Sequence, residues 1–422
     1  MSTPSRKLRL ETAGASSAPV VAAIAVLLGG VISLHADWPQ FLGPARNGTC
    51  SAAAIAKSWP KEGPKRLWVK DVGEGFSGPV IAGSRVILNH RLAGKDRVEC
   101  FDWATGKSLW IQDVPARYVD DFGFDQGPRA TPSIEGDHVV TLGADGLVRC
   151  LSLSEGAVLW SVDGKAVYSS RKGFFGLAPS PLIHKGMVFL NIGGTDGASV
   201  VALDLTSGGL RWKAGDDEAS YASPVLAERP EGTQLLVLTR DALMGFDPST
   251  GRLIFRYPWR PTTHASVSAA TPLVVGDTVF LSASYDTSST LLRFGAGDPK
   301  PVWSGPEILA SHYTTPVAHG GHLYGLDGRQ ERGCELRCVD LDSGKVAWTI
   351  PGWPAGSLLI AGEELLILSE KGELIRGKAS PEKFIETGRA QLLPFLARAH
   401  PALSEGRFYA RSKDKLFCFD LR

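Results

Sequence analysis

An eleven-residue pattern that recurs along the chain constrains its fold more than any other feature. Residues 100–110 read CFDWATGKSLW: a short apolar run, an Asp, a turn rich in Thr and Gly, and a second run that ends in Trp. One copy alone predicts only a β-hairpin around a glycine-bearing turn. Further copies, the last two of them degenerate, occupy residues 202–212, 245–255, 338–348, 150–160 and 293–303. This repetition predicts a chain built from one supersecondary unit.

Each repeat can be traced as a unit of four expected strands. The first follows a Ser/Thr-Pro dipeptide, and the second is rich in Val, Leu and Phe. The third carries a small residue and the Asp, and the fourth ends in Trp. The first strands start at residues 79, 132, 181, 224, 272, 316, 358 and 401. A spacing of 42 to 53 residues with four strands per unit is typical of β-propeller blades.

The two ends of the chain predict how such a ring closes. The last unit stops at Arg422 without its Trp strand, whereas residues 66–70 have the fourth-strand pattern with no strands before them. We therefore expect 66–70 to complete the eighth blade, which removes an open sheet edge. In the seventh unit Phe384 or Ile385 takes the place of the Trp. The prediction is an all-β, eight-bladed propeller of four-stranded antiparallel blades over residues 66–422.

Three positions of the repeat are expected to be structural. A large aromatic residue at one repeated position is typical of packing between blades rather than of ligand stacking. These residues are Trp68, Trp110, Trp160, Trp212, Phe255, Trp303 and Trp348. The recurrent Asp is expected to cap a turn, at Asp102, Asp204, Asp247, Asp340 and Asp420. The small position accepts Cys, Ala or Gly, which predicts buried thiols rather than disulfides at Cys100, Cys150, Cys338 and Cys418.

The N-terminus is typical of an export signal. Basic residues precede an apolar run, residues 18–34, and a small-residue cleavage site follows at Ala36. We expect residues 1–36 to be a signal peptide and the mature protein to be periplasmic. The alternative is an uncleaved segment that anchors the protein to a membrane. Residues 37–65 have no regular pattern and are expected to lie along the surface of the main domain.

The repeat also resembles a known motif. Residues 100–110 and 338–348 are similar to the tryptophan-docking motif of the pyrroloquinoline-quinone (PQQ) propellers, A-x-D-x-x-x-G-K-x-x-W, with Cys in place of Ala. Residues 37–41, DWPQF, look like the start of exported PQQ-like repeat proteins of planctomycetes and related bacteria. The resemblance implies the fold of the eight-bladed quinoprotein alcohol dehydrogenases and of the non-enzymatic outer-membrane assembly factor BamB. It implies no chemistry, because the motif lies in the blade scaffold.

A dehydrogenase of that family needs residues beyond the blades. The resemblance implies Glu, Asn and Asp ligands for Ca²⁺, an Asp base, an Arg on the quinone and a vicinal Cys-Cys ring. This chain has no adjacent cysteines and only three Asn, at 47, 89 and 191. PQQ with Ca²⁺ therefore finds no support in the ligand set. The chain also lacks the common hydrolase, nucleotide and zinc signatures, so we expect no catalytic residues, no metal site and no cofactor.

The residues just before the first strands predict a binding site. In propellers these strands line the central channel, and ligands collect at its mouth. The candidates are Glu74, Phe76, Arg129, Phe174, Phe175, Tyr221, His264, His312, Tyr313, Arg398 and His400. Two Arg among aromatic residues suit an anionic or planar ligand. The alternative is that these residues pack loops around a water-filled channel. The loop 116–127, with Tyr118, Phe122 and Phe124, is expected to form a lid or a docking surface.

Together these features predict an exported, non-catalytic protein that acts as a scaffold or a ligand-binding module. The expected partner is another protein, or a small anionic or planar ligand at the channel mouth. A net charge of +1 argues against nucleic acid as a partner, and we expect a monomer. The alternatives are a PQQ-dependent dehydrogenase with a divergent site and, on fold analogy alone, a propeller hydrolase or lyase that acts on carbohydrate.

Overall fold

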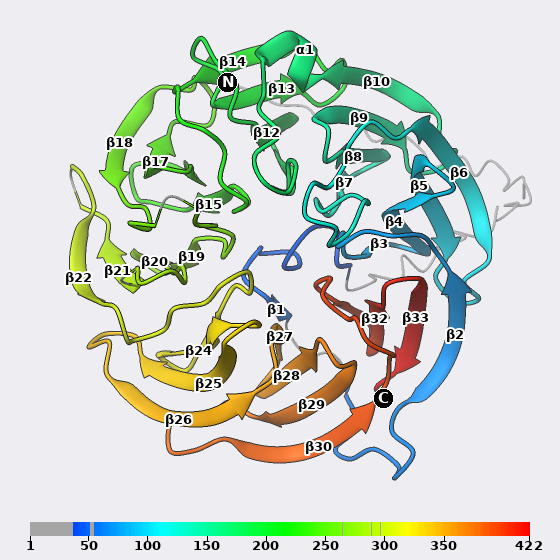
Figure 1. Cartoon of the computed structure of the whole chain (residues 1–422), viewed down its shortest axis with the longest axis vertical. Helices are drawn as coiled ribbons and strands as arrows, with labels where there is room; N and C mark the ends of the chain where they lie inside the picture. The colour runs from blue at the N-terminus through cyan, green and yellow to red at the C-terminus, as the bar shows by residue number, and fades with distance from the viewer. Residues whose placement is uncertain (1–36, 51–54, 264, 288, 296) are drawn as a thin grey trace, which may run out of the picture. The chain divides into compact units, whose positions relative to one another are not determined.

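Eight sheets follow one another around a central channel in the structure, a computed structural model (Figure 1). The structure describes residues 37–50, 55–263, 265–287, 289–295 and 297–422. The expected signal peptide, 1–36, and His264 lie outside the described residues. The described residues form one unit, and none of their helices is long and apolar enough to span a bilayer.

Apart from two strands of the N-terminal segment, the strands of each blade run antiparallel and in chain order from the channel outward. In blades 1 to 4 they are β3 (Val80–Ala82), β4 (Arg85–Leu92), β5 (Lys95–Asp102), β6 (Ser108–Pro115); β7 (Ser133–Glu135), β8 (His138–Leu142), β9 (Leu147–Ser152), β10 (Val158–Asp163); β11 (Leu182–His184), β12 (Met187–Asn191), β13 (Val200–Asp204), β14 (Leu210–Ala214); and β15 (Val225–Ala227), β16 (Gln234–Leu238), β17 (Ala242–Phe246), β18 (Leu253–Pro258). A short helix, α1 (Gly164–Tyr168), follows β10.

The remaining blades repeat this order. In blades 5 to 7 the strands are β19 (Leu273–Val275), β20 (Thr278–Leu281), β21 (Ser289–Arg293), β22 (Lys300–Gly305); β23 (Val317–His319), β24 (His322–Arg329), β25 (Gly333–Asp340), β26 (Val346–Trp353); and β27 (Gly356–Ala361), β28 (Glu364–Ser369), β29 (Glu373–Lys378), β30 (Ile385–Gln391). Blade 8 combines β31 (Ala402–Ser404), β32 (Arg407–Arg411) and β33 (Lys415–Asp420) with β2 (Lys65–Asp71) from the other end of the chain.

The ring closes through β2. This strand pairs antiparallel with β33, and Trp68 lies opposite Cys418. The predicted eight-bladed fold and its closure by an N-terminal strand are thereby confirmed. Seven of the eight inner strands also begin one residue after the expected position, because the Pro or its equivalent lies just before each of them.

The repeated Trp residues join each blade to the next. The indole N–H of Trp68 donates to the backbone carbonyl of Trp103 at 3.0 Å, and that of Trp212 donates to Pro248 at 2.8 Å. Equivalent bonds run from Trp110 to Leu153, Trp160 to Leu205, Trp303 to Leu341 and Trp348 to Ser380. The indole ring of each Trp also covers the turn glycine of the next blade. For example, a Cβ on Gly251 would lie 2.5 Å from the Trp212 ring. Each Trp therefore fixes the register between two blades.

Two details of the repeat differ from the prediction. The fourth strand does not end at the Trp: β6 starts two residues before Trp110 and continues to Pro115. In blade 7, neither Phe384 nor Ile385 occupies the Trp position. By pairing register that position is Gly388, opposite Arg376. Trp59, from the segment before β2, covers the gap, and the Arg376 guanidinium lies 5.0 Å from the Trp59 ring centroid.

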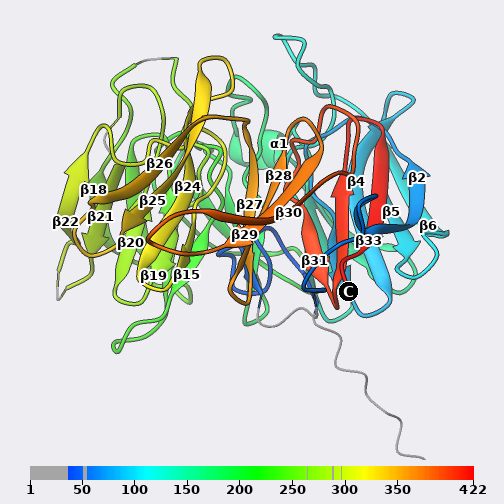
Figure 2. The same cartoon turned by 90° about the horizontal axis from the view of Figure 1, so that it is seen from below.

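The N-terminal segment does not simply lie along the surface. Residues 37–50, here called the plug, contact the inner strands of several blades and cross one end of the channel (Figure 2). Trp38 forms a β-bridge with Ile81 of blade 1 and is 1% exposed. Further along, β1 (Thr49–Cys50) pairs in parallel with β27. Blade 7 is therefore five-stranded, which corrects the expectation of four strands in every blade.

Candidate functional site

The channel is a blind funnel that ends on the plug. Its open end holds an upper chamber of about 180 Å³, and below it lies a lower chamber of about 170 Å³. The two chambers share Phe76, Arg129, Tyr221, Tyr313 and Arg398 among their lining residues. Phe41, which belongs to the plug, also lines the lower chamber. The funnel is therefore lined by residues of several blades and, in the lower chamber, by the plug, and concave sites of this kind are where small molecules bind.

Most of the sequence candidates meet in this funnel. The upper chamber is lined by Phe76, Arg129, Phe175, Tyr221, His312, Tyr313 and Arg398. His400 lines only the lower chamber. Two candidates lie elsewhere: the Glu74 carboxylate is 3.6 Å from Lys413 Nζ, and Phe174 packs against Phe122 with ring centroids 6.2 Å apart.

Sequence reasoning missed the polar and aromatic lining residues Tyr285, Gln330 and Glu331 of the upper chamber, as well as three small apolar ones, Ala178, Val267 and Ala269. The polar and aromatic ones lie in the connections between the second and third strands of blades 5 and 6. In an antiparallel blade these connections emerge at the same end as the entry to the first strand. Polar and aromatic residues in the second hairpin of each repeat were therefore the signal to look for.

Two guanidinium groups flank one aromatic ring at the mouth. The Arg129 and Arg398 guanidinium carbons lie 5.8 Å and 5.3 Å from the Phe76 ring centroid. Arg398 Nε donates to Glu370 at 2.6 Å, and the Tyr313 hydroxyl donates to the same carboxylate oxygen. Burial, and then the nearby carboxylate, raise the pKa of Tyr313, so its hydroxyl remains a donor. The wall of the funnel is thus preorganised before any ligand arrives.

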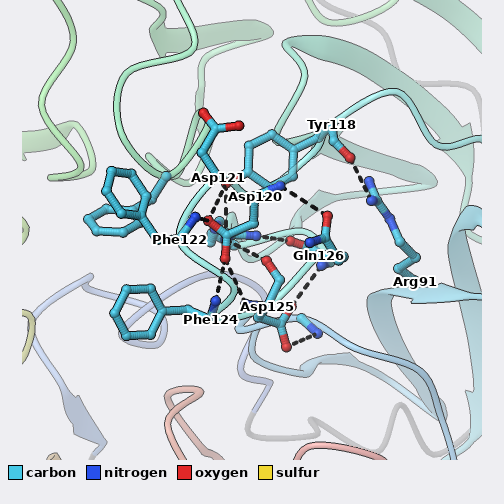
Figure 3. A network of polar contacts seen from close by, with 12 residues as sticks. Arg91, Tyr118, Asp120, Asp121, Phe122, Phe124, Asp125 and Gln126 are labelled. Atoms are coloured by element: carbon cyan, nitrogen blue, oxygen red, sulfur yellow. Dashed lines mark hydrogen bonds and ion pairs between the residues drawn. The ribbon is translucent and has the colours of Figure 1, made fainter.

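The loop 116–127 is ordered by one buried carboxylate (Figure 3). Asp120 accepts hydrogen bonds from the backbone N–H groups of Phe122, Phe124 and Asp125 at 3.3, 2.6 and 2.9 Å. Burial alone would raise the pKa of Asp120, but these donors outweigh it and hold the pKa below its ordinary value. Phe122 and Phe124 are left 53% and 52% exposed. Phe124 lines the upper chamber, whereas Phe122 does not line it.

A histidine in the wall of the upper chamber has a fixed tautomer. His312 Nδ1 lies 2.8 Å from Gln330 Oε1, and Nε2 lies 2.9 Å from the Tyr285 hydroxyl. Because the Gln oxygen can only accept, Nδ1 carries the proton and Nε2 accepts from Tyr285. Burial lowers the pKa of His312, which favours this neutral form. The pair therefore presents a neutral, aromatic surface to the chamber.

His400 lines the lower chamber of the funnel, and we expect it to make the free energy of unfolding depend on pH. Its ring stacks on Trp38 at 6.3 Å, and burial lowers its pKa to about 4. The unfolded state then binds a proton at a higher pH than the folded state, so this stabilisation is complete above about pH 6.5 and is lost as the pH falls toward 4. The full effect is about 3 kcal/mol. Since the ring faces the lower chamber, we expect water to reduce it to about 1–2 kcal/mol.

Urea unfolding at pH 7 and pH 4.5 checks this prediction. The loss of unfolding free energy between the two pH values should be larger in the wild type than in His400→Phe, which keeps an aromatic ring but cannot titrate. Equal losses in the two proteins would show that another group causes the acid sensitivity.

The residues of the funnel do not fit a calcium–quinone centre of the dehydrogenase type. Among the described residues, no three Asp, Glu, His or Cys side chains lie close enough together to hold a metal ion. Glu331 is the one carboxylate that lines the upper chamber, and it accepts a hydrogen bond from Gln330 Nε2. Glu370 is bound to Arg398 and Tyr313. A hard cation would find a single carboxylate here, fewer oxygen ligands than it requires.

Two larger grooves lie away from the channel. A groove of about 490 Å³ lies beside Arg117 and Arg171, but Arg117 pairs with Asp145 and Asp163, and Arg171 pairs with Glu218. A second groove of about 660 Å³ lies beside Phe255, at the joint where Phe replaces the Trp wedge. Neither groove lies in the channel, where most of the sequence candidates meet.

Comparisons with known proteins agree on the fold. The model of the family described as outer membrane protein assembly factor BamB matches residues 57–225 and 94–350. Similar solved structures are a quinohemoprotein alcohol dehydrogenase from Comamonas testosteroni (14% identity, 91% of this chain and 80% of that chain covered, TM-score 0.66) and a europium-containing methanol dehydrogenase (11%, 89% and 89%, 0.67). A third is the computationally designed Ika8 protein (12%, 85% and 100%, 0.58).

At these identities the structural likeness shows the fold alone. A search of curated proteins finds no match to the chain. The matches give no support to an origin in planctomycetes.

Proposed function

The chain belongs to the family of the outer membrane protein assembly factor BamB, and from this premise we propose that it is a non-catalytic binding protein. Its blind funnel takes a small planar ligand at the open end. The expected setting is the periplasm, because the sequence predicts that residues 1–36 are an export signal. The family name supports a binding role, since an assembly factor works by holding other molecules.

The observation that carries the proposal is the closure of one end of an aromatic channel. The plug supplies Phe41 to the lower chamber, while Phe76, Phe124, Phe175 and Tyr221 line the upper chamber. Phe175 lies 5.8 Å from Phe124 and 5.9 Å from Tyr221, centroid to centroid. Rings at these distances can pack a planar ligand without first rearranging.

Binding of the uncharged aromatic dye N-phenyl-1-naphthylamine tests this proposal, because its fluorescence rises when it leaves water. We expect saturable binding, and we expect Phe124→Ala to weaken it about tenfold, which corresponds to roughly 1.4 kcal/mol for one aromatic contact. Phe122→Ala is the matched control. Phe122 lies on the same loop with nearly the same exposure but does not line the chamber.

Equal weakening by both variants would place the dye on the outside of the loop rather than in the funnel. Absence of saturable binding to the wild type would reject the planar-ligand proposal.

A PQQ-dependent dehydrogenase is the second candidate, because the tryptophan-docking motif in the sequence resembles that of the PQQ propellers. Titration with PQQ and Ca²⁺, followed by dye reduction with alcohols and sugars, separates the two functions. Binding of PQQ that is independent of Ca²⁺ and without turnover supports the binding protein. Calcium-dependent turnover would replace it with the enzyme.

A protein scaffold is favoured by one further observation. Val119 and Phe122 are 62% and 53% exposed on the loop 116–127, and large exposed apolar side chains are typical of docking surfaces. If the loop docks a partner, replacing both by Ser should abolish capture of that partner and leave dye binding unchanged. Capture that survives the double replacement would exclude this loop as the docking surface.

A further inference from the structure

A belt of hydroxyl groups joins neighbouring blades around the funnel. The residue before the inner-strand Pro supplies each hydroxyl: Thr131 Oγ1 accepts from the N–H of Gly78 at 3.0 Å, and Ser180 Oγ accepts from that of Thr131 at 2.9 Å. The same link runs from Ser180 to Ser223, from Ser223 to Thr271 and from Thr271 to Thr315. Each of the five hydroxyl oxygens thus accepts a hydrogen bond from a backbone N–H at the start of the preceding blade.

The hydroxyl groups that line the lower chamber donate no hydrogen bond to any described residue. Four members of the belt line the lower chamber, Thr131, Ser180, Ser223 and Thr315, together with Ser357. All five residues are 5% exposed or less. No described residue accepts a hydrogen bond from any of the five side chains. A hydroxyl oxygen that already accepts an N–H is a stronger donor through its own proton, so the lower chamber is rich in unused donors.

The charged side chains that line the lower chamber are also hydrogen-bond donors. Its lining contains Arg129 and Arg398 and no carboxylate. The carboxylates nearest to these side chains, Asp120 at 3.9 Å and Glu370 at 2.6 Å, are not part of the lining. Arg398 donates to Glu370 only through Nε, and its Nη groups have no acceptor in the described part of the chain. The Nη groups of Arg129 already donate to the backbone carbonyls of Gly127 and Asp125 and to the Tyr118 hydroxyl. The Arg398 Nη groups and the hydroxyl protons are therefore the donors that lie at the chamber without an acceptor.

We propose that the lower chamber is an oxyanion site that takes one carboxylate, sulfate, sulfonate or phosphate group. The group can be a free inorganic anion or the acidic end of the planar ligand; only the second source rests on the proposed function. A chamber of about 170 Å³ has room for one such group. The belt then has two roles, since it joins the blades and binds the anion.

Two pairs of probes test this site. Calorimetric titration compares sodium sulfate with sodium chloride at constant ionic strength. Fluorescence compares 8-anilinonaphthalene-1-sulfonate with N-phenyl-1-naphthylamine, which has the same rings without the sulfonate. We expect sulfate to bind and chloride not to, and the sulfonate dye to bind at least tenfold more tightly than the neutral dye, because one hydrogen bond to a charged group contributes about that factor.

Ser357→Ala is the diagnostic variant, because the Ser357 hydroxyl has no partner among the described residues and its loss should not disturb the fold. We expect it to weaken sulfate and sulfonate binding about tenfold and to leave the neutral dye unchanged. Ser404→Ala is the matched control: Ser404 is 1% exposed and its hydroxyl has no partner, but it does not line the chamber. It should change none of the affinities.

The outcomes separate the two sources and the two proposals. Sulfate binding without a preference for the sulfonate dye assigns the chamber to a free anion. A dye preference without sulfate binding assigns it to the acidic end of a larger ligand. Failure of the neutral dye alone rejects the planar ligand and leaves the oxyanion site. No preference for either oxyanion, or affinities unchanged in Ser357→Ala, would overturn the oxyanion site and leave the belt as a structural link between blades.

Discussion

Trp212→Ala should lower the unfolding free energy by about 3–5 kcal/mol, the loss expected when a buried Trp is cut back to Ala. Trp212 is 8% exposed, packs between Phe189 and Phe246 at 5.8 and 6.0 Å, and covers the turn glycine of the next blade. The truncation leaves a cavity at the joint between blades 3 and 4. Equilibrium unfolding in urea measures the effect.

Two further variants divide this loss into its causes. Trp212→Phe keeps a ring but loses the N–H bond to Pro248, which should cost about 1 kcal/mol or more. Leu210→Ala, on the same strand and 49% exposed, should cost less than about 0.5 kcal/mol. A Leu210 variant as destabilised as Trp212→Ala would contradict the role of Trp as the wedge between blades.

Trp38→Ala should have an effect of similar size, about 3–5 kcal/mol, although Trp38 lies outside the repeats. The side chain is 1% exposed, and a Cβ on Gly43 would lie 3.0 Å from its ring. Its backbone pairs with Ile81 of blade 1. Because the plug forms the floor of the funnel, we expect the same variant to weaken binding of the neutral dye.

Ala45→Ser is the matched control, since Ala45 belongs to the same segment and is exposed. It should change neither stability nor dye affinity. If Trp38→Ala unfolds at the wild-type urea concentration, the plug is not part of the cooperative unit and the funnel is not reliably closed.

The ring could be predicted because its rules repeat. Six Trp residues, the turn Asp and the Pro before seven of the eight inner strands have the same structural role in successive blades, so each copy supports the others. Asp102 is an example of such a local role. Its carboxylate accepts a hydrogen bond from the N–H of Thr105 at 2.8 Å, and the hydrogen bond from the Thr105 hydroxyl is the main reason that the pKa of Asp102 is lowered. Such local signals are readable without a structure.

The floor of the funnel could not be predicted in the same way. Nothing repeats in residues 37–50, and Trp38 is buried against two distant parts of the chain, Ile81 in blade 1 and His400 just before blade 8. The same holds for Trp59, which replaces the wedge of blade 7 because Gly388 leaves a gap there. Long-range packing of this kind leaves no period in the sequence.

The walls of the funnel were predicted in part. Arg129, Arg398 and the aromatic residues could be predicted because they lie at the entries to the inner strands. Tyr285 and Gln330 lie instead in the connections between the second and third strands of blades 5 and 6. The Ser/Thr before Pro was visible as a marker of strand starts. The sequence does not show that its hydroxyl group joins two blades, because the N–H donor belongs to a neighbouring blade.

A crystal structure of the protein with N-phenyl-1-naphthylamine tests the central claim most directly. We predict that the rings of the dye lie in the upper chamber, against Phe124, Phe175 and Tyr221, with the plug closed beneath them. Dye bound instead in the groove beside Phe255, or no dye at a concentration that saturates fluorescence, would contradict the claim that the funnel is the binding site.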